Sequence, residues 1–347
     1  MTLRVLAAGD EFVLPSLLRD ALTRELGDDI DVRELAFPWP TEPFGPVAEV
    51  DEATGTEQQV IDALGDAEVC VMHQAPLTER VLASCRTLRL ACIGRGGPVN
   101  ANLDAATARG VAVCNAPGRN ATATAEHTLA LILAAVRQVP QRQAELLAGD
   151  WRSDYYRYDQ VGPELENSIV GLVGYGAIGS RVARMLAGFG ANVLVHDPYV
   201  DRVTLPDAAE AVGSLDELLS RSRIITLHAR LTPETRGLIG ADQIAHLPDG
   251  AILVNAARGA LLDYDALCDA LEVGKLFAAA LDVYPEEPLP AGARLRKAPR
   301  TVLTPHLAGA SKQTAQKAAS SVAAEVGRYV RGEPLQHCVN PEVLRGH

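Results

Sequence analysis

A glycine-rich turn near the middle of the chain most constrains what this sequence can fold into. An apolar strand at 168–173 runs directly into Gly174–Gly179, which has the spacing GxGxxG, and a helical pattern follows. Glycines at this spacing permit a tight turn, close approach of the backbone to a pyrophosphate, and close packing of helix on strand. The free N–H groups at the helix start attract an anion. The segment predicts a dinucleotide site formed by Gly174, Gly176, Ala177, Ile178 and Gly179.

A carboxylate follows the next predicted strand. Asp197 comes directly after residues 192–196, where a carboxylate can accept hydrogen bonds from both ribose hydroxyls of a dinucleotide and repel the extra phosphate of NADP. We therefore predict NAD as the cofactor. Arg202 is close enough in sequence to weaken the preference against NADP.

Composition and charge limit the class of protein. The 347 residues suffice for two domains with cores of their own, and 48% hydrophobic with only 4% aromatic residues suits helices packed on a parallel sheet. The net charge of −12 argues against a nucleic-acid or anionic-membrane partner. Local cations must then capture an anionic substrate.

Cysteine and histidine usage point to an intracellular protein without a metal. The six cysteines form no C-x-x-C pair, and the eight histidines show no metal-ligand spacing. No apolar stretch approaches the ~20 residues of a membrane span, and the N-terminus lacks the pattern of a signal peptide. We expect reduced cysteines, no catalytic metal, no membrane partner and a cytoplasmic location.

Two rhythms of alternating strands and helices predict two parallel α/β domains. The first has strands expected at 3–8, 30–35, 68–72, 88–93 and 111–114. The second begins with a long helix at 122–139 and has six strands expected near Ile169, Val193, Ile224, Ile252, Ala278 and Val302. A final helix at 311–329 should pack back on the first domain. The predicted fold is a doubly wound NAD-binding Rossmann domain, residues 116–308, inserted into a smaller flavodoxin-like substrate domain, residues 1–115 and 309–347.

Two segments lie outside these series of alternating strands and helices and are interpreted separately. Four prolines within residues 37–47 exclude a helix or a central strand and predict an exposed surface loop, with a mobile flap as the alternative. After the long helix, Trp151, Tyr155, Tyr156 and Tyr158 cluster in a chain poor in aromatic rings. Aromatic clusters are enriched at interfaces, so we predict a homodimer formed through this helix and arm. A loop folded back within one subunit is the alternative.

Three later segments each place a chemically useful side chain at the end of a predicted strand. Arg258 follows one strand, the carboxylates of Asp282, Glu286 and Glu287 follow the next, and His306 follows the last. A guanidinium can hold an anionic substrate and polarise its carbonyl group. A histidine can take and return a hydroxyl proton, and a carboxylate beside it raises its pKa. Together these groups suit hydride transfer at a 2-hydroxy or 2-keto acid.

The motifs that surround these residues resemble the D-isomer-specific 2-hydroxyacid dehydrogenase family over nearly the whole chain. The matching segments are 115–118, 125–130, the glycine turn, 255–259, 280–283, 287–288 and 304–306. The resemblance implies that Arg258 binds substrate, that Glu287, chosen over Glu286, orients His306, and that His306 is the general acid/base. It further implies that Asp282 contacts the nicotinamide carboxamide of the cofactor. Ala256 is placed at the cofactor site, and His228, one of three histidines at strand ends that are interpreted as structural, is the one expected to border the cofactor. His127 and Glu126 are interpreted as packing or capping groups.

The substrate loop departs from the family pattern. The resemblance implies that backbone N–H groups of residues 94–100, Gly96 and Gly97 among them, bind the substrate carboxylate, with Gln74 nearby. Here, however, the loop reads RGGPVN, and His73-Gln74 stands where phosphoglycerate-type members often have Arg-Ser. The missing cation disfavours a substrate with a distal phosphate. Arg230 replaces a usual proline and either approaches the ribose or faces solvent.

The sequence thus predicts an NAD-dependent oxidoreductase that interconverts a small anionic D-2-hydroxy acid and its 2-keto acid. Two alternatives remain open at this point: an NADH-sensing, corepressor-like interaction protein, and an enzyme that oxidises another small anion such as phosphite.

Overall fold

The computed structural model describes residues 2–200, 205 and 209–346, and the chain separates into two compact units. Unit 1 consists of Met1–Asn120 and Ala310–His347, and unit 2, Ala121–Gly309, is inserted between these two parts. The sequence predicted these divisions after residues 115 and 308. Arg202, the residue expected to weaken the preference against NADP, lies outside the described residues.

Unit 1 is built on a parallel sheet with the strand order β2-β1-β5-β6-β7 in the described residues. This is the flavodoxin-like order, in which the first and third strands in sequence meet at the centre. All five predicted strands are present. Its strands are β1 (Leu3–Asp10), β2 (Ile30–Phe37), β5 (Val69–Met72), β6 (Leu90–Ile93) and β7 (Ala112–Cys114). Its helices are α1 (Pro15–Leu26), α2 (Glu57–Leu64), α3 (Glu79–Ser84), α4 (Leu103–Ala108) and α11 (Lys312–Arg331), and a 3-10 turn, η5, covers Pro341–Gly346.

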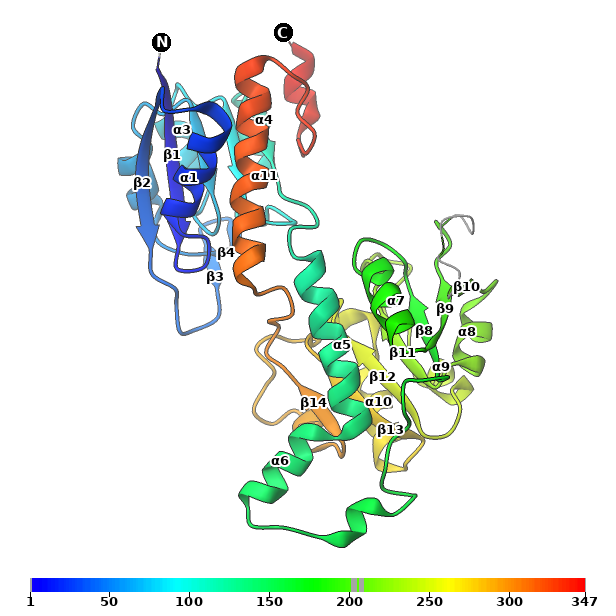
Figure 1. The fold of residues 1–347 in the computed structure, drawn as a ribbon. Helices are drawn as coiled ribbons and strands as arrows, with labels where there is room; N and C mark the ends of the chain where they lie inside the picture. The colour runs from blue at the N-terminus through cyan, green and yellow to red at the C-terminus, as the bar shows by residue number, and fades with distance from the viewer. Residues whose placement is uncertain (1, 201–204, 206–208, 347) are drawn as a thin grey trace. The chain divides into compact units, whose positions relative to one another are not determined.

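Helices cover both faces of this sheet, which explains why its strands are continuous apolar runs. One face packs against α1 and α11 through residues such as Leu18, Ala318 and Val322. The other face packs against α2, α3 and α4. Figure 1 shows α11 lying alongside α1, although most of the chain separates them in sequence. The prediction that the C-terminal helix returns to the first domain is confirmed.

The proline-rich segment 37–47 is only in part the surface loop that the sequence predicts. Phe37 ends β2 as a buried residue, and β3 (Gly45–Val47) forms a short antiparallel hairpin with β4 (Val50–Ala53). Pro46 is accommodated because a two-stranded ribbon leaves one side of each strand unpaired. The rings of Trp39 and Phe44 pack edge to face with centroids 4.9 Å apart, so part of the segment is held by aromatic contacts.

Unit 2 contains a larger parallel sheet, with the order β10-β9-β8-β11-β12-β13-β14 in the described residues. The strand order reverses between β8 and β11, which is the switch point where doubly wound sheets bind dinucleotides. Its strands are β8 (Ile169–Val173), β9 (Asn192–His196), β10 (Ala209–Ala211), β11 (Ile224–Leu227), β12 (Ala251–Asn255), β13 (Leu276–Leu281) and β14 (Thr301–Leu303). The sequence predicted six of these seven strands and missed β10, a three-residue edge strand.

The helices of unit 2 also lie on both faces. One face packs against α5 and α7, and the other packs against α8, α9 and α10 (Figure 1). The helices are α5 (Ala121–Arg137), α6 (Val139–Leu147), α7 (Gly179–Gly188), α8 (Leu215–Arg221), α9 (Ala241–His246) and α10 (Tyr264–Glu272), with 3-10 turns η1 (Ser153–Tyr156), η3 (Gly259–Leu261) and η4 (Arg294–Lys297). The α/β fold with two parallel sheets confirms the predicted fold class.

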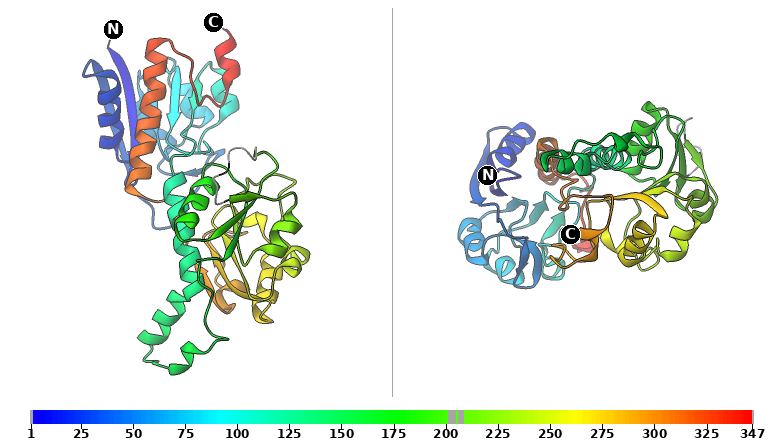
Figure 2. Two further views of the ribbon diagram at one scale, coloured as in Figure 1. Left: turned by 45° about the vertical axis from the view of Figure 1, so that its right-hand side comes forward. Right: turned by 90° about the horizontal axis from the view of Figure 1, so that it is seen from below.

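The segment that follows α5 leaves the body of unit 2. No residue of α6 is buried, and α6 with the chain after it extends away from the sheet in both Figure 1 and Figure 2. Trp151, Tyr156 and Tyr158 are 88%, 92% and 96% exposed. Tyr155 differs, because the guanidinium groups of Arg142 and Arg152 lie 4.4 and 5.0 Å from its ring centroid. The aromatic cluster is therefore a largely uncovered arm.

None of the cysteines forms a disulfide bond. All six cysteines are free thiols, and five of them are buried. Burial raises the pKa of Cys70 well above its ordinary value, so this thiol stays protonated.

Among the described residues, none of the helices is both long and apolar enough to span a membrane, and no group of three metal-ligating side chains occurs.

Candidate functional site in the inserted unit

The glycine turn lies at the carboxyl end of β8 and leads into α7. Gly174 adopts φ +99°, and a Cβ there would lie 2.8 Å from the backbone of His228. A Cβ on Gly179 would lie 2.4 Å from the Gly174 carbonyl oxygen, so strand and helix can approach this closely only at glycine. A Cβ on Gly176 would meet no atom within 4 Å. The three glycines therefore serve the turn, the packing and an open approach to the backbone.

The start of α7 is suited to an anion. Ile178 precedes the helix as its N-cap and makes no side-chain capping hydrogen bond, so the first N–H groups of the helix are not satisfied by a cap. With its positive dipole end and the open space beside Gly176, this turn fits the pyrophosphate of a dinucleotide.

Asp197 is held beside the glycine turn. It follows β9, and its Oδ2 accepts a hydrogen bond from the Tyr175 N–H at 2.7 Å, while Oδ1 accepts one from the Tyr199 N–H at 2.9 Å. These bonds fix the carboxylate against the glycine turn and leave lone pairs on both oxygens. The side chain is partly exposed. The residues present therefore fit a dinucleotide with a free ribose diol.

His228 and Ala256 come directly after β11 and β12, the first two strands beyond the switch point. The Thr226 hydroxyl lies 3.1 Å from Nε2 of His228, and burial lowers the pKa of His228 to about 4. The imidazole is therefore neutral at physiological pH and adds no positive charge beside the glycine turn. Ala256 is buried directly after β12. Their predicted contacts with the cofactor stay predictions.

Arg258 is held at the end of a turn that Asn255 organises. The Asn255 side chain accepts from the Ala257 N–H at 3.0 Å and donates to the Arg258 carbonyl at 2.9 Å. Gly259 follows because a Cβ there would lie 1.9 Å from the Tyr284 carbonyl oxygen. Arg258 itself is exposed, and its charge acts on both Glu287 and His306. Its Nη1 donates to the Ala257 carbonyl at 2.6 Å, and the other guanidinium donors can bind an incoming anion.

Asp282 anchors the segment that carries the catalytic candidate His306. It is wholly buried after β13, and Oδ1 accepts from the Thr304 hydroxyl at 2.6 Å and from the Leu307 N–H at 3.0 Å. Its Oδ2 accepts from the Ala308 N–H at 2.8 Å. The contact of Asp282 with a nicotinamide carboxamide stays a prediction, whereas its hydrogen bonds hold residues 304–308 in place.

Glu287 and His306 form a close pair. Nδ1 of His306 lies 2.5 Å from Oε2 of Glu287, and Oε1 of Glu287 accepts from the Tyr284 N–H at 2.9 Å. Burial acts to raise the pKa of Glu287, but the bonds from His306 and Tyr284 and the nearby Arg258 outweigh it, and the pKa is lowered. Glu286 is exposed and is not part of this pair.

The bond with Glu287 raises the pKa of His306 above its ordinary value. The charges of Glu287 and Asp282 act in the same direction, whereas burial and Arg258 oppose them. His306 also adopts φ +50°, a conformation that non-glycine residues rarely take and that is concentrated at functional sites. Because Nδ1 is bonded to Glu287, Nε2 is the ring atom left to exchange a proton with a ligand.

Several positioning residues were not predicted as such. The Tyr284 hydroxyl donates to the Thr304 carbonyl at 2.9 Å, and the Tyr264 hydroxyl donates to the Val283 carbonyl at 2.6 Å. Nε2 of His127 lies 3.1 Å from the Thr304 hydroxyl, which agrees with the structural interpretation of His127. The polar residues after β13 marked this region in the sequence, but no local pattern shows that they hold residues 304–308.

The predicted substrate-binding residues Gln74, Gly96 and Gly97 belong to unit 1. Gln74 is buried, and its Oε1 accepts from Nη1 of Arg95 at 2.5 Å. A Cβ on Gly96 or Gly97 would meet nothing within 4 Å, so the backbone of both is open to a ligand. Their part in binding substrate stays a prediction. Arg230 is exposed.

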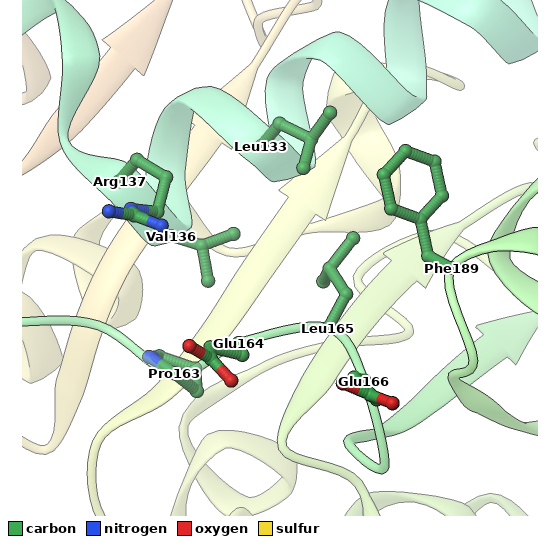
Figure 3. A pocket seen from close by; sticks show the side chains of 8 residues that line it. All are labelled: Leu133, Val136, Arg137, Pro163, Glu164, Leu165, Glu166 and Phe189. Atoms are coloured by element: carbon green, nitrogen blue, oxygen red, sulfur yellow. The ribbon is translucent and has the colours of Figure 1, made fainter.

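One pocket of unit 2 lies away from these residues. It encloses about 360 Å³ and is lined by Leu133, Val136, Arg137, Pro163, Glu164, Leu165, Glu166 and Phe189. Figure 3 shows these side chains coming from the end of α5, the segment before β8 and the residue after α7. The pocket therefore lies at the amino-terminal end of β8 and at the carboxyl-terminal end of α7. The glycine turn lies at the other end of each element, between the carboxyl end of β8 and the start of α7. The pocket is not part of the candidate site.

Comparison with known proteins identifies this arrangement. Residues 129–308 match the sequence model of the D-isomer specific 2-hydroxyacid dehydrogenase, NAD binding domain, which covers more than half of the chain. The chain belongs to the D-isomer specific 2-hydroxyacid dehydrogenase family. Unit 2 therefore contains the NAD-binding domain of this family, and NAD is its cofactor, as the glycine turn and Asp197 predicted.

Individual proteins also resemble the chain in sequence and fold. It is 40% identical over 300 residues to a D-3-phosphoglycerate dehydrogenase of Methanocaldococcus jannaschii, covering 85% of this chain and 56% of that protein. The TT0316 protein of Thermus thermophilus matches with a TM-score of 0.76 at 30% identity, over 97% of this chain and all of that one. A D-lactate dehydrogenase of Treponema pallidum matches with a TM-score of 0.78 at 26% identity, over 96% and 99% of the two chains. The chain spans about half the length of the curated relatives it matches.

Proposed function

We propose that this protein is an NAD-dependent dehydrogenase that interconverts a D-2-hydroxy acid and its 2-keto acid. The observation that carries the proposal is the His306–Glu287 pair, which lies in the same unit as the NAD-binding glycine turn and within the electrostatic reach of Arg258. When bound at that turn, NAD supplies the hydride acceptor and NADH the hydride donor.

His306 acts as the general acid/base. In oxidation its neutral Nε2 takes the hydroxyl proton of the substrate, and in reduction the protonated ring returns that proton to the carbonyl oxygen. Glu287 stabilises the charged ring and fixes the proton on Nδ1, which keeps Nε2 directed to the reaction.

Arg258 binds the substrate carboxylate and polarises the reacting carbonyl group. Its guanidinium stays charged and offers two donors to a carboxylate. By the family resemblance, the open backbone at Gly96 and Gly97 and the side chain of Gln74 contribute further substrate contacts. The substrate is then a small 2-oxoacid anion.

NADH oxidation by the purified protein over a panel of 2-oxoacids tests this function. The panel contains glyoxylate, pyruvate, hydroxypyruvate, branched and aromatic oxoacids, each repeated with NADPH. We expect turnover of one class of oxoacid with NADH and at least tenfold less with NADPH because of Asp197. Tight NADH binding without turnover of any oxoacid would contradict the proposal and favour the sensor or phosphite alternatives.

We also propose a homodimer formed through α5, α6 and the aromatic arm. Large exposed rings on an arm without buried residues are costly in water and are typical of interface anchors. Light scattering at micromolar concentration should give the mass of two chains, and a triple variant with Trp151, Tyr156 and Tyr158 changed to Ser should shift it toward one. A monomer mass for the unchanged protein would refute the dimer.

A further inference from the structure

The carboxyl edge of the sheet in unit 1 gathers charged residues that the proposed proton transfer does not use. Asp10 ends β1, His73 and Gln74 follow β5, and Arg95 follows β6. Arg119 comes in the turn after β7. Because all these strands are parallel, their carboxyl ends share one edge of the sheet.

Backbone contacts tie together the two segments that carry the arginines. The Ala116 N–H donates to the Arg95 carbonyl at 2.7 Å, and the Asn115 side chain donates to the Gly96 carbonyl at 2.9 Å. Arg119 follows three residues after Ala116. The two guanidinium groups are close enough that the charge of Arg95 lowers the pKa of Arg119.

Arg119 lacks the partners that a partly buried guanidinium requires. Its Nε is shielded from solvent and donates to no acceptor in the described part of the chain, where Arg119 also forms no ion pair. Burial and the neighbouring Arg95 lower its pKa to about 10, and Asp10 only partly opposes them. The side chain stays charged at neutral pH while its donor is unmet.

The nearby carboxylates are already engaged. Oδ1 of Asp10 accepts from the N–H groups of Phe12 and Val13 at 3.0 and 2.8 Å, and Oδ2 lies 2.7 Å from Nδ1 of His73. Glu52 is paired with Arg95. His73 is neutral, since burial lowers its pKa more than Asp10 raises it. Within the described residues, the positive charge of Arg119 is therefore not paired with a carboxylate.

We propose that Arg95 and Arg119 form a binding site on unit 1 for a compact anionic group, either a phosphate or a carboxylate. Arg95 already donates to Glu52 and Gln74, so an anion there would accept from the unmet donor of Arg119 and offset the repulsion between the two guanidinium groups. Arginine suits this role because its planar donors match the oxygens of phosphate and carboxylate.

This site defines the substrate class if the proposed function holds. Its occupant is then a second anionic group of the 2-hydroxy acid, separate from the carboxylate next to the reacting carbon. Arg119 would supply, from a different segment, the cation that is absent at His73. On this proposal, the absence of an arginine at position 73 does not by itself exclude a distal phosphate.

The rings beside these residues support a shaped site. Trp39 stacks on His73 with ring centroids 6.4 Å apart and planes 18° apart, and Phe12 lies 5.7 Å from the same imidazole. These rings pack on the imidazole on which the charges of Arg119 and Arg95 also act, so they lie beside the proposed site.

Direct anion binding is the first test and needs no catalytic activity. Inorganic phosphate and malonate are titrated calorimetrically into the protein, the Arg119→Met variant and the Arg109→Met control, whose arginine is exposed at the end of α4. We expect at least tenfold weaker binding of one or both anions by Arg119→Met and no change for Arg109→Met. Equal binding by all three proteins, or no binding by the unchanged protein, would overturn the site.

An Arg119→Lys variant separates charge from folding. It keeps the positive charge and loses the forked donor, so it should bind more tightly than Arg119→Met and less tightly than the unchanged protein. If Lys and Met weaken binding equally while thermal melting is the same, a charge-based site is ruled out.

Kinetics then identify the source of the anion. Pyruvate carries one anionic group, oxaloacetate carries two carboxylates, and 3-phosphohydroxypyruvate carries a carboxylate and a phosphate. We expect Arg119→Met to raise the KM of one doubly charged oxoacid at least tenfold and that of pyruvate less than twofold. The substrate affected tells carboxylate from phosphate, and an equal effect on pyruvate would contradict the assignment.

The two proposals fail in different ways. If the unchanged protein reduces no oxoacid but binds phosphate through Arg119, the dehydrogenase function is wrong and the anion site stands. If it reduces oxoacids but neither anion binding nor the KM of any oxoacid depends on Arg119, the function stands and the anion site is wrong.

Discussion

Each unit of the molecule carries a histidine bonded through Nδ1 to a carboxylate at the carboxyl edge of its parallel sheet. In unit 1, His73 lies 2.7 Å from Asp10, and in unit 2, His306 lies 2.5 Å from Glu287. The pairs differ in access to solvent, because the His73 side chain is 2% exposed and that of His306 is 50% exposed.

Because of this difference in solvent access, the pKa is lowered in one histidine and raised in the other, although each is bonded to a carboxylate. Burial is the dominant influence on His73 and lowers its pKa despite Asp10, whereas the bond with Glu287 is the dominant influence on His306 and raises its pKa. A histidine–carboxylate pair is therefore suited to proton transfer only where the charged ring is tolerated and a ligand can reach it. The unit 1 pair is a structural element by this criterion.

The largest expected effect concerns the reacting pair. His306→Asn should lower kcat for oxoacid reduction by about 10²–10⁴, because the proton donor is lost while the glycine turn is untouched. NADH binding, followed by fluorescence titration, should stay within twofold. The control is His246→Asn, which changes an exposed histidine on α9. Turnover of His306→Asn close to that of the control would remove His306 from the mechanism.

The next effect concerns the partner of His306. Glu287→Gln removes the carboxylate that raises the pKa of His306, so the rate of reduction above neutral pH should fall about tenfold. Reduction requires the protonated ring and is lost as pH rises through that pKa. A lowered pKa therefore moves the alkaline limb of the pH–rate profile to lower pH.

The adjacent exposed residue supplies the control for this experiment. Glu286→Gln removes the same charge one residue away and should leave the profile in place. Superimposable profiles for the two variants would mean that the contact with Glu287 does not set the proton affinity of His306.

The smallest expected effect concerns the buried pair and appears in stability. The pKa of His73 is lower in the folded chain than in the unfolded one, so its favourable contribution is complete above about pH 6.5 and is lost as pH falls toward the folded value. The loss is at most about 1.4 kcal/mol per pH unit. His73→Asn should flatten the fall in Tm between pH 7 and pH 5, relative to both the unchanged protein and His246→Asn. An equally steep fall in His73→Asn would show that His73 is not the group that resists protonation.

Much of the fold could be predicted because its strands are local and strongly marked. Continuous apolar runs such as those of β1 and β12 are required wherever helices cover both faces of a sheet. Residues 209–211 lack such a run and form a strand only because β9 offers an unpaired edge. The hairpin of β3 and β4 was missed for a similar reason, since prolines are excluded from central strands but are accepted in a two-stranded ribbon.

The candidate site could be predicted only as separate segments. Arg258, Glu287 and His306 were found because each stands in a motif at the end of a strand. The sequence did not predict the hydrogen bonds that Asp282 and Tyr284 make with residues 304–308, because hydrogen bonds between distant segments leave no periodic pattern in the sequence. Arg119 was missed altogether, since its unmet donor depends on what surrounds it in space.

The sequence by itself determined two alternating α/β rhythms, the NAD-binding turn with Asp197, and the three segments that carry the reacting groups, because strand periodicity and glycine geometry are local properties. Only the tertiary structure decided that Nδ1 of His306 meets Oε2 of Glu287, that Asp10 and His73 are buried while Glu287 and His306 are accessible, and that Arg119 lies near Arg95 without an ion pair in the described part of the chain. Burial and the distances between charges set the pKa of a group, and both arise only when distant segments pack together.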